Sequence, residues 1–264
     1  MNSITINNVD YQVTNATRFS EFWTHVNNST WESSTINVIT KNLNTNDVYI
    51  DIGAWIGPTV LAAASTGCTV HAYEPDPVAF AELSANIQVN EIDCIILNNV
   101  ALFDRNGEMS FGSGRGDTLG DSISSLMNGQ GSIQVPVRDI ANESTQSFFK
   151  RCKLLKIDVE GAEYVIVPRM ASYLTEHQPN LLLSIHGMKT AGYRGFAGFL
   201  KMMRHRLMIL EHLWPYKYQF IESRRGWLDS NASWANFSLL KKINFVLSTR
   251  GNRELMLSNT PLLY

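Results

Sequence analysis

Long apolar runs, a basic leader and a large net charge are all missing from this chain. The first ten residues, MNSITINNVD, include no basic or apolar stretch, and no later segment is apolar for long enough to cross a bilayer. We therefore expect a cytoplasmic protein with no membrane span. The formal net charge is only −2, so no overall attraction to nucleic acid or anionic membranes is expected.

Cysteine is also scarce. Cys68, Cys94 and Cys152 are widely spaced and each lies beside an apolar run, which favours free thiols in a reducing compartment over a zinc cluster. No G-x-x-x-x-G-K-[ST] sequence occurs, so a P-loop site for a nucleoside triphosphate is not expected. With 264 residues, the chain is long enough for one catalytic domain and some additional segments.

The most informative segment present is VYIDIGAWIG, which runs from Val48 to Gly57. Three strand-forming residues precede the acid Asp51 and a fourth, Ile52, follows it before the first glycine. A helix-compatible segment comes after the second glycine, so the pattern predicts a buried strand, a turn and a helix. Glycine lacks a Cβ atom, so a ligand can approach the backbone at Gly53 and Gly57. Their separation differs from the G-x-G-x-x-G of dinucleotide sites, which weakens a pyrophosphate interpretation.

A second strand, Cys68 to Tyr73, is followed by Glu74. An acid about twenty residues after the first glycine is placed to accept hydrogen bonds from a ribose diol. The alternative is that Glu74 only caps the helix that Pro75 to Pro77 introduce. The joint pattern with the glycine turn favours ribose binding.

The block KIDVEGAE, from Lys156 to Glu163, places Lys156, Asp158 and Glu160 at a period of two where a strand ends. Side chains with this period share one side of a strand, so all three are predicted near the carboxyl edge, where open α/β sheets bind ligands. Asp158 or Glu160 would then deprotonate a hydroxyl or hold a divalent cation. The alternatives are that Glu160 caps the next helix and that Lys156 pairs with Asp158.

Another apolar strand, Asn180 to Ile185, ends at His186, which the same edge argument places at the site as a general base or metal ligand. Glu163, in contrast, is predicted to be a surface helix residue. The glycine-rich stretch Gly107 to Gly131 is predicted to be either an active-site flap or an exposed hairpin.

Alternation of strands and helices from Val48 onward predicts a doubly wound parallel sheet. Residues 1–47 are predicted to form an N-terminal extension that packs as a lid or dimer contact, and residues 48–264 the catalytic domain. Further predicted elements are a hairpin (4–13), helices at 19–26, 31–43, 77–90 and 195–213, and strands at 94–98, 154–158, 214–221 and 244–249. In the helix at 195–213, Phe196, Phe199, Met202 and Met203 are predicted to be buried, and Lys201, Arg204, His205 and Arg206 to form a solvated basic face.

Taken in order, DIGAWIG, YEPDP and KIDVEGAE resemble the blocks of FkbM-type methyltransferases, a family of class I S-adenosylmethionine-dependent enzymes. The resemblance spans Val48 to Gly187 and implies a Rossmann-like, mostly parallel seven-stranded sheet, an S-adenosylmethionine cofactor and a sugar hydroxyl as acceptor. The family commonly has an acid where this chain has Ser184, which weakens a metal assignment to Asp158 and His186. The cofactor residues implied are Asp51, Gly53, Ala54 and Gly57 at the methionine end, Glu74 at the ribose, and Asp76 and Ala101 near the adenine. Pro75, between Glu74 and Asp76, is also implied to bind the cofactor.

Three functions follow as hypotheses. The main one is an O-methyltransferase that acts on a small molecule or glycan, with Asp158, Glu160 and His186 as catalytic residues. The second is an RNA ribose methyltransferase, which predicts salt-sensitive binding through Arg204, Arg206, Arg224 and Arg225 and is disfavoured by the acidic balance. The third is a cofactor-binding protein without catalysis, which the intact KIDVEG block disfavours.

Overall fold

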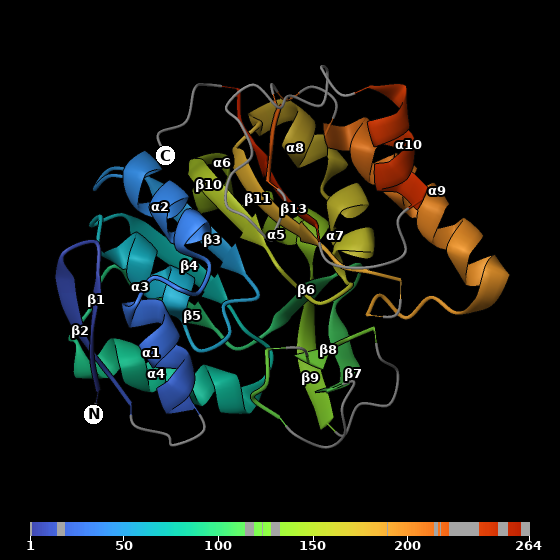
Figure 1. The fold of residues 1–264 in the computed structure, drawn as a ribbon. Helices are drawn as coiled ribbons and strands as arrows, with labels where there is room; N and C mark the ends of the chain where they lie inside the picture. The colour runs from blue at the N-terminus through green and yellow to red at the C-terminus, as the bar shows by residue number, and fades with distance from the viewer. Residues whose placement is uncertain are drawn as a thin grey trace.

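The computed structural model describes residues 2–14, 19–113, 119–122, 124–127, 133–188, 190–213, 216, 218–221, 238–247 and 253–259. A seven-stranded sheet forms its centre, in the order β12-β13-β11-β10-β3-β4-β5 (Figure 1). The strands are β3 (Val48–Ile52), β4 (Thr69–Tyr73), β5 (Ile95–Asn98), β10 (Cys152–Ile157), β11 (Asn180–Ile185), β12 (Tyr218–Ile221) and β13 (Arg253–Leu257).

The five strands from β11 to β5 are parallel, whereas β13 pairs antiparallel with both β11 and β12. The expected doubly wound, mostly parallel α/β sheet is therefore confirmed, with a mixed edge. Because consecutive strand residues point to opposite faces, Tyr49 and Ile50 pack into different hydrophobic clusters.

Helices cover both faces of this sheet (Figure 1). One face carries α2 (Ser33–Asn42), α3 (Pro58–Ala64) and α4 (Pro77–Val89). The other carries α5 (Ile140–Glu143), α6 (Ser147–Lys150), α7 (Glu163–Arg169), α8 (Ala171–His177) and α9 (Gly195–Leu213). The carboxyl ends of the parallel strands stay open between these two layers.

A smaller sheet lies beyond those carboxyl ends (Figure 1). Its strands are β6 (Ala101–Phe103), β7 (Gly107–Ser113), β8 (Ser124–Ser125) and β9 (Ile133–Asp139), in the order β6-β9-β7-β8. The predicted irregular stretch from Gly107 to Gly131 thus begins as a regular strand that pairs with β9, while residues 114–118, 123 and 128–131 lie outside the described part of the chain.

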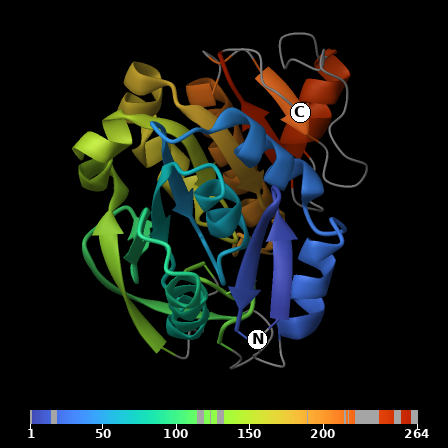
Figure 2. The same ribbon diagram turned by 90° about the vertical axis from the view of Figure 1, so that its left-hand side faces the viewer.

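The first part of the chain packs against the layer of α3 and α4. The predicted hairpin is confirmed as β1 (Asn2–Ile6) and β2 (Val9–Val13), and Figure 2 shows it at the front of the molecule beside these helices. The Tyr11 hydroxyl donates to the Leu61 carbonyl (3.1 Å), and the backbone N–H of Gln12 donates to Asn90 (2.8 Å). The helix α1 (Ser20–Asn27) follows and precedes α2.

The predicted strand at 244–249 is wrong. Residues Leu239–Leu247 form the helix α10, and the last described strand is β13. Leu239, Leu240, Ile243 and Leu247 recur at helical spacing, and a short apolar run of this kind cannot be told from a strand by its composition. Of the predicted strand at 214–221, only β12 is described as a strand, and Arg224, Arg225 and Trp227 lie outside the described residues.

Two side chains of α9 also differ from expectation. Phe196, predicted to be buried, is 76% exposed in the first turn, and Arg206, predicted on a solvated basic face, is 1% exposed. Its guanidinium Nε donates to the Tyr164 hydroxyl (2.9 Å), which gives this buried charge a polar partner. Among the described residues, no helix combines the length and apolar character that a bilayer span requires.

Candidate active site

One cavity of about 230 Å³ opens at the carboxyl edge of the central sheet. Its wall includes the ends of β3, β4, β10 and β11, the small sheet and the segment that joins α1 to α2. Open parallel sheets place their ligand sites at this edge. Of the predicted site residues, eight line the cavity: Gly53, Ala54, Glu74, Pro75, Ala101, Asp158, Glu160 and His186.

The turn after β3 brings backbone into the cavity wall. Gly53 has a φ of 90°, and a Cβ atom there would overlap the carbonyl oxygen of Asp158, so only glycine allows the two loops to meet. The N–H groups of Gly53 and Ala54 both donate to the Tyr73 carbonyl, at 3.0 and 3.1 Å. Gly57, with a φ of 97°, stands immediately before α3 and does not line the cavity.

Glu74 is almost fully buried at the end of β4. Its two carboxylate oxygens accept from the backbone N–H groups of Trp55 (2.8 Å) and Asp76 (2.7 Å), so it joins the glycine turn to the start of α4. Burial raises the pKa of Glu74 to about 8, and these two hydrogen bonds oppose part of the rise. A ligand that donates hydrogen bonds to this buried carboxyl would stabilise its ionised form.

Helix capping belongs to the neighbouring acid. The side chain of Asp76 accepts from the N–H groups of Val78 (2.8 Å) and Ala79 (3.3 Å) at the start of α4, and from that of Gly120 (2.5 Å). The alternative in which Glu74 caps this helix is therefore wrong. Asp76 does not line the cavity, so its contacts position the turn from behind.

Asp51 also lies behind the cavity wall and is fully buried. It accepts from the hydroxyls of Thr59 (2.5 Å) and Tyr49 (3.1 Å), and the Lys156 ammonium lies 3.3 Å away. Burial alone would lower the pKa of Lys156, but the charges of Asp51, Asp158 and Glu32 hold it above its usual value. The predicted pairing of Lys156 with Asp158 is present at 3.6 Å.

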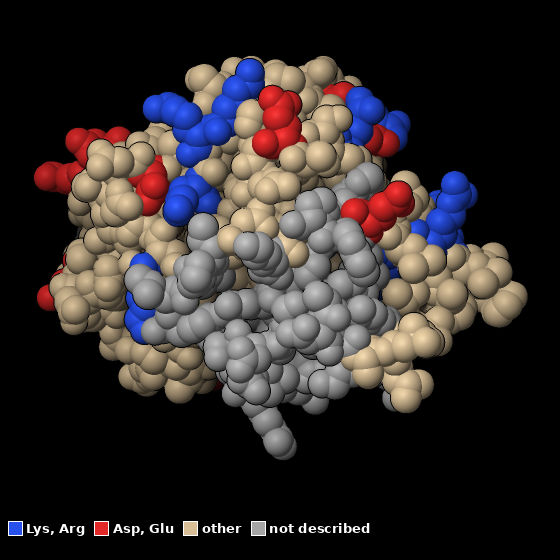
Figure 3. Space-filling model, turned by 90° about the horizontal axis from the view of Figure 1, so that it is seen from above, with Lys and Arg blue, Asp and Glu red and all other residues tan. Residues whose placement is uncertain are grey.

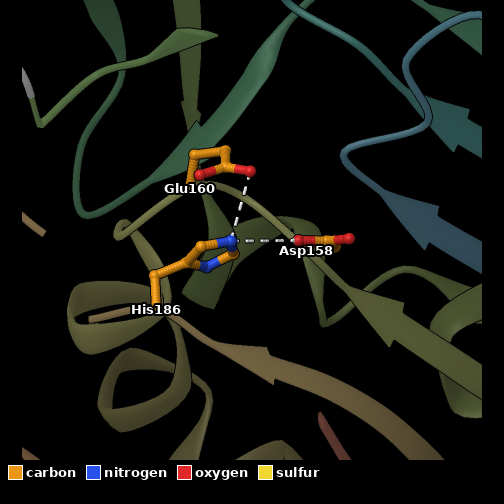
Figure 4. Close-up of side chains that lie close together, drawn as sticks. All are labelled: Asp158, Glu160 and His186. Carbon is orange, nitrogen blue, oxygen red and sulfur yellow. Dashed lines mark ion pairs between the residues drawn. The ribbon is translucent and has the colours of Figure 1, made fainter. Parts of the chain in front are cut away.

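Asp158, Glu160 and His186 converge on one point of the cavity (Figure 4). The His186 Nε2 atom lies 3.2 Å from Glu160 and 3.6 Å from Asp158. One donor atom from each of the three residues can be chosen so that all lie within 4.8 Å of one another. Glu160 reaches this position from a left-handed backbone (φ 48°) in the loop, because β10 already ends at Ile157.

The electrostatics of this cluster follow from burial and proximity. Burial alone would lower the pKa of His186, but the carboxylates of Glu163, Glu160 and Asp158 raise it well above its usual value. Burial raises the pKa of Glu160, and His186 opposes that rise. The protonated form of His186 is thus favoured by the three acids around it, and in that form the ring attracts Glu160 and Asp158.

The prediction for Glu163 is wrong. This residue has no exposed surface, and its Oε1 atom accepts from the His186 backbone N–H (2.6 Å) and lies 3.2 Å from the Nδ1 of the same residue. Its Oε2 atom accepts from the N–H of Gly161 (2.8 Å). Glu163 thus orients the histidine from the side opposite the cavity. The predicted capping by Glu160 is not observed, since α7 begins at Glu163 without a side-chain cap.

Several lining residues carried no clear signal in the sequence. Phe22, Trp31 and Glu32 come from the N-terminal part, and Asp121 and Ser122 from the segment between β7 and β8. Trp55 lies between the two glycines of the turn, where its position is the only hint of a role. Its indole N–H donates to the Gly120 carbonyl (3.0 Å), and the Ser125 hydroxyl donates to the Glu160 carbonyl (2.7 Å). Gly120 and Ser125 therefore connect the glycine turn with the loop that follows β10.

A comparison with known families adds to this geometry. The profile of the methyltransferase FkbM domain matches residues 51–214, which include the glycine turn and the acid–histidine cluster. The chain belongs to the FkbM methyltransferase family. The resemblance of the three sequence blocks to this family is confirmed. Among curated proteins, no match was found.

Solved structures of methyltransferases resemble this FkbM-family chain weakly. The methyltransferase FkbM from Methylobacillus flagellatus KT has 17% identity and a TM-score of 0.39 over 54% of this chain and 33% of its own. An rRNA methylase from Streptococcus thermophilus has 9% identity and a TM-score of 0.44 over 85% of this chain and 93% of its own. The Pyrococcus abyssi tRNA (uracil-54, C5)-methyltransferase in complex with S-adenosyl-L-homocysteine has 12% identity and a TM-score of 0.38 over 84% of this chain and 39% of its own. Similarities this low say nothing about a substrate.

Proposed function

We propose that this FkbM-family protein is an S-adenosylmethionine-dependent O-methyltransferase that acts on a hydroxyl of a sugar, in a glycan or a glycosylated metabolite. One observation carries the proposal. A single cavity joins the glycine turn and Glu74 to the cluster of Asp158, Glu160 and His186. Methyl transfer to a hydroxyl needs a methyl donor and a proton acceptor side by side, and these are the two ends of the cavity.

The cofactor end is built from backbone and one buried acid. S-adenosylmethionine supplies an electrophilic methyl group on a sulfonium. Gly53 and Ala54 leave room for its methionine portion, and Glu74 accepts hydrogen bonds from the ribose hydroxyls. Pro75 and Ala101 border the adenine. Asp51, Gly57 and Asp76 act from outside the cavity, where they hold Lys156 and the starts of α3 and α4.

The acceptor end removes the proton. Asp158 and Glu160 both line the cavity, and one of the two carboxylates takes the hydroxyl proton. S-adenosylmethionine would supply the methyl group to the acceptor oxygen, and its S–CH3 bond would break to leave S-adenosylhomocysteine. The carboxylates of Glu163, Glu160 and Asp158 raise the pKa of His186, which favours the two acids in the cavity over the histidine as acceptor of this proton. His186 holds the two carboxylates in position at 3.2 and 3.6 Å.

The same three residues fit a divalent cation. Two carboxylate oxygens and an imidazole nitrogen can lie within 4.8 Å of one another, and the second ring nitrogen faces the buried acid Glu163, as in many metal-binding histidines. Asp158, Glu160 and His186 would hold the ion. It would lower the pKa of the acceptor hydroxyl and so assist its deprotonation. Ser184 lines the cavity where the family commonly has an acid, and it would leave one charge fewer around such an ion.

The charges around the cavity support a neutral acceptor. Apart from the carboxyl of Glu74, four acids line it, Glu32, Asp121, Asp158 and Glu160, against the bases Lys156 and His186. Figure 3 draws another aspect of the surface, one face seen from above, on which the coloured basic and acidic groups are interspersed. The hypothesis of RNA binding also relied on Arg206, which is buried. These observations disfavour a polyanionic acceptor.

A labelling experiment tests the proposal. The protein is incubated with methyl-labelled S-adenosylmethionine and a cell extract, and the product is treated separately with glycosidases, nuclease and protease. We expect glycosidases to release the label from the product of the wild-type protein. Asp158→Asn should transfer no label to the extract. The location of the label on a sugar oxygen is then read by mass spectrometry. Label found only in nuclease-sensitive material would overturn the sugar assignment.

A further inference from the structure

Part of the cavity wall comes from outside the family domain. The match to the FkbM family begins at residue 51, yet Phe22, Trp31 and Glu32 line the same cavity as Asp158 and His186. Phe22 lies on α1, and the other two lie in the short connection to α2. Two residues of this connection, Ser29 and Glu32, have left-handed backbones, with φ of 55° and 38°. Such conformations are strained for residues that carry a side chain, and they persist where the surroundings hold them.

Glu32 lies at the acceptor end of the cavity. It lines a second, small recess together with Lys156 of β10 and Ser184 of β11, and its charge contributes to the raised pKa of Lys156. In the central sheet, β10 and β11 are on one side of β3, whereas β4 and β5, which precede Glu74 and Ala101, are on the other. Glu32 therefore lies on the side of Asp158, away from the proposed ribose and adenine positions.

Three aromatic rings line the cavity between Glu32 and the glycine turn. Phe22 packs edge-to-face against Trp31, with ring centroids 5.0 Å apart, and against Trp55, at 4.5 Å. The three rings hold one another and form a continuous aromatic wall. Rings held in this way offer a large contact area at a small cost in conformational entropy.

The polar groups beside this wall are hydroxyls and carboxylates. Glu32, Ser122 and Ser184 line the cavity. Asp121 and Ser124 line it as well, and the two Asp121 oxygens accept from the hydroxyls of Ser124 (2.8 Å) and Ser113 (2.6 Å). Ionised carboxylates only accept hydrogen bonds, so they suit a ligand that carries many hydroxyl donors and repel one that carries an anionic group. An aromatic face suits the C–H side of a saturated ring.

We propose that Trp31, Glu32 and Phe22 form the subsite that binds the acceptor, and that it takes an uncharged pyranose ring. The ring stacks against the aromatic wall, and Glu32 accepts hydrogen bonds from its hydroxyls. The N-terminal extension, outside the family domain, then determines which acceptor is methylated. This inference rests on the proposed function and adds the residues that recognise the substrate.

Binding measurements without turnover test the subsite. Saturation-transfer NMR is recorded with methyl mannopyranoside, methyl rhamnopyranoside and methyl glucopyranoside, and with methyl glucuronide as an anionic counterpart, all in the presence of S-adenosylhomocysteine. We expect binding of at least one neutral glycoside and none of the glucuronide. Trp31→Ala should lower the affinity for the neutral glycoside about tenfold. Trp31→Phe should lower this affinity much less, since part of the ring contact remains. Glu32→Gln should also lower the affinity for the neutral glycoside.

Matched variants separate recognition from stability. Phe80 belongs to the same hydrophobic cluster as Trp31 but does not line the cavity, and Glu21 is an exposed acid of α1. Phe80→Ala and Glu21→Gln should leave glycoside affinity unchanged. If Trp31→Ala does not fold, Trp31→Phe and Glu32→Gln still decide the question.

The outcomes for the two proposals are distinct. Failure of the wild-type protein to bind S-adenosylhomocysteine by calorimetry would count against the proposed function. Binding of S-adenosylhomocysteine without any neutral glycoside, or equal glycoside affinity in wild type, Trp31→Ala and Glu32→Gln, would overturn the subsite and leave the methyltransferase assignment standing.

Discussion

A single carboxylate oxygen of Glu163 contacts His186 twice, at the backbone N–H (2.6 Å) and at the ring Nδ1 (3.2 Å). This contact fixes the ring at the end of β11 against the first turn of α7. The opposite ring nitrogen, Nε2, then faces Glu160 and Asp158. The position of His186 beside Glu160 and Asp158 therefore depends on a residue that does not line the cavity.

Replacement of Glu163 tests this dependence. In Glu163→Gln, an amide nitrogen must face either the Gly161 N–H or the His186 N–H, which leaves two donors in contact. We expect a decrease in kcat of about 10–100-fold, as for other residues that orient a functional histidine. S-adenosylhomocysteine affinity should stay within about twofold of wild type, because Glu74 and the glycine turn are not changed.

The control for this variant is Glu176→Gln, whose side chain in α8 is 76% exposed. Thermal unfolding of both variants separates loss of fold from loss of ring position. An unchanged kcat in a folded Glu163→Gln protein would contradict the positioning role.

Metal removal gives a second prediction. Dialysis against a chelator should lower methyl transfer, and Mg²⁺ or Mn²⁺ should restore it, because a cation bound by Asp158, Glu160 and His186 would acidify the acceptor hydroxyl. Mn²⁺ binding measured by electron paramagnetic resonance should weaken at least about tenfold in His186→Ala. Glu82→Gln, in α4 and outside the cavity, is a control. Full activity after complete chelation would show that the carboxylates work alone.

Much of the cluster follows from local sequence rules. Asp158 and His186 each come directly after an apolar strand, and parallel strands end at a common edge, so their proximity was predictable. Glu160 also lines the cavity as predicted, but strand alternation is not the reason, because β10 ends at Ile157 and Glu160 enters the cavity from a left-handed loop position. Lys156, predicted at the same side, does reach the cavity wall and also pairs with the buried Asp51.

Other features depend on contacts between distant parts of the chain. Glu163 is buried because His186, 23 positions away, brings a backbone donor to it. Trp31 and Glu32 reach the cavity only once α1 and α2 pack on the domain, and no local pattern marks them. Arg206 is similar, since a charged residue of an amphipathic helix looks solvated until the Tyr164 hydroxyl is placed beside it.

The pKa of Glu74 gives a pH-dependent prediction. Burial raises it to about 8, so the carboxyl is mostly protonated at pH 7 without cofactor. Ribose hydroxyls that donate to Glu74 favour its ionised form, so cofactor binding should release a proton in this range. Affinity for S-adenosylhomocysteine should then rise with pH, by up to about tenfold per unit, until about pH 8. Calorimetry in buffers of different ionisation enthalpy measures the proton release.

The ionisation of Glu74 has the opposite effect on stability, which falls with rising pH whereas cofactor affinity rises. Because the pKa of Glu74 is higher in the folded protein than the ordinary value of 4.5, this residue lowers the free energy of unfolding progressively as pH rises from about 4.5 to about 8. Glu74→Gln should remove that part of the pH dependence, both for stability and for cofactor affinity. Identical pH profiles for wild type and Glu74→Gln would rule out the carboxyl as the linked group.

The contact between the glycine turn and the loop that follows β10 gives the last prediction. Gly53 and Gly107 both have positive φ, of 90° and 133°, but a Cβ atom at Gly53 would overlap the Asp158 carbonyl, whereas one at Gly107 would meet nothing within 4 Å. Both alanine variants carry a backbone cost of about 1–2 kcal/mol, and Gly53→Ala adds about 1–3 kcal/mol from overpacking. Urea unfolding should therefore show a larger loss for Gly53→Ala. Since relief of the overlap requires Asp158 to move, this variant should also lose methyl transfer while Gly107→Ala keeps it, and equal effects would contradict the close approach of the two loops.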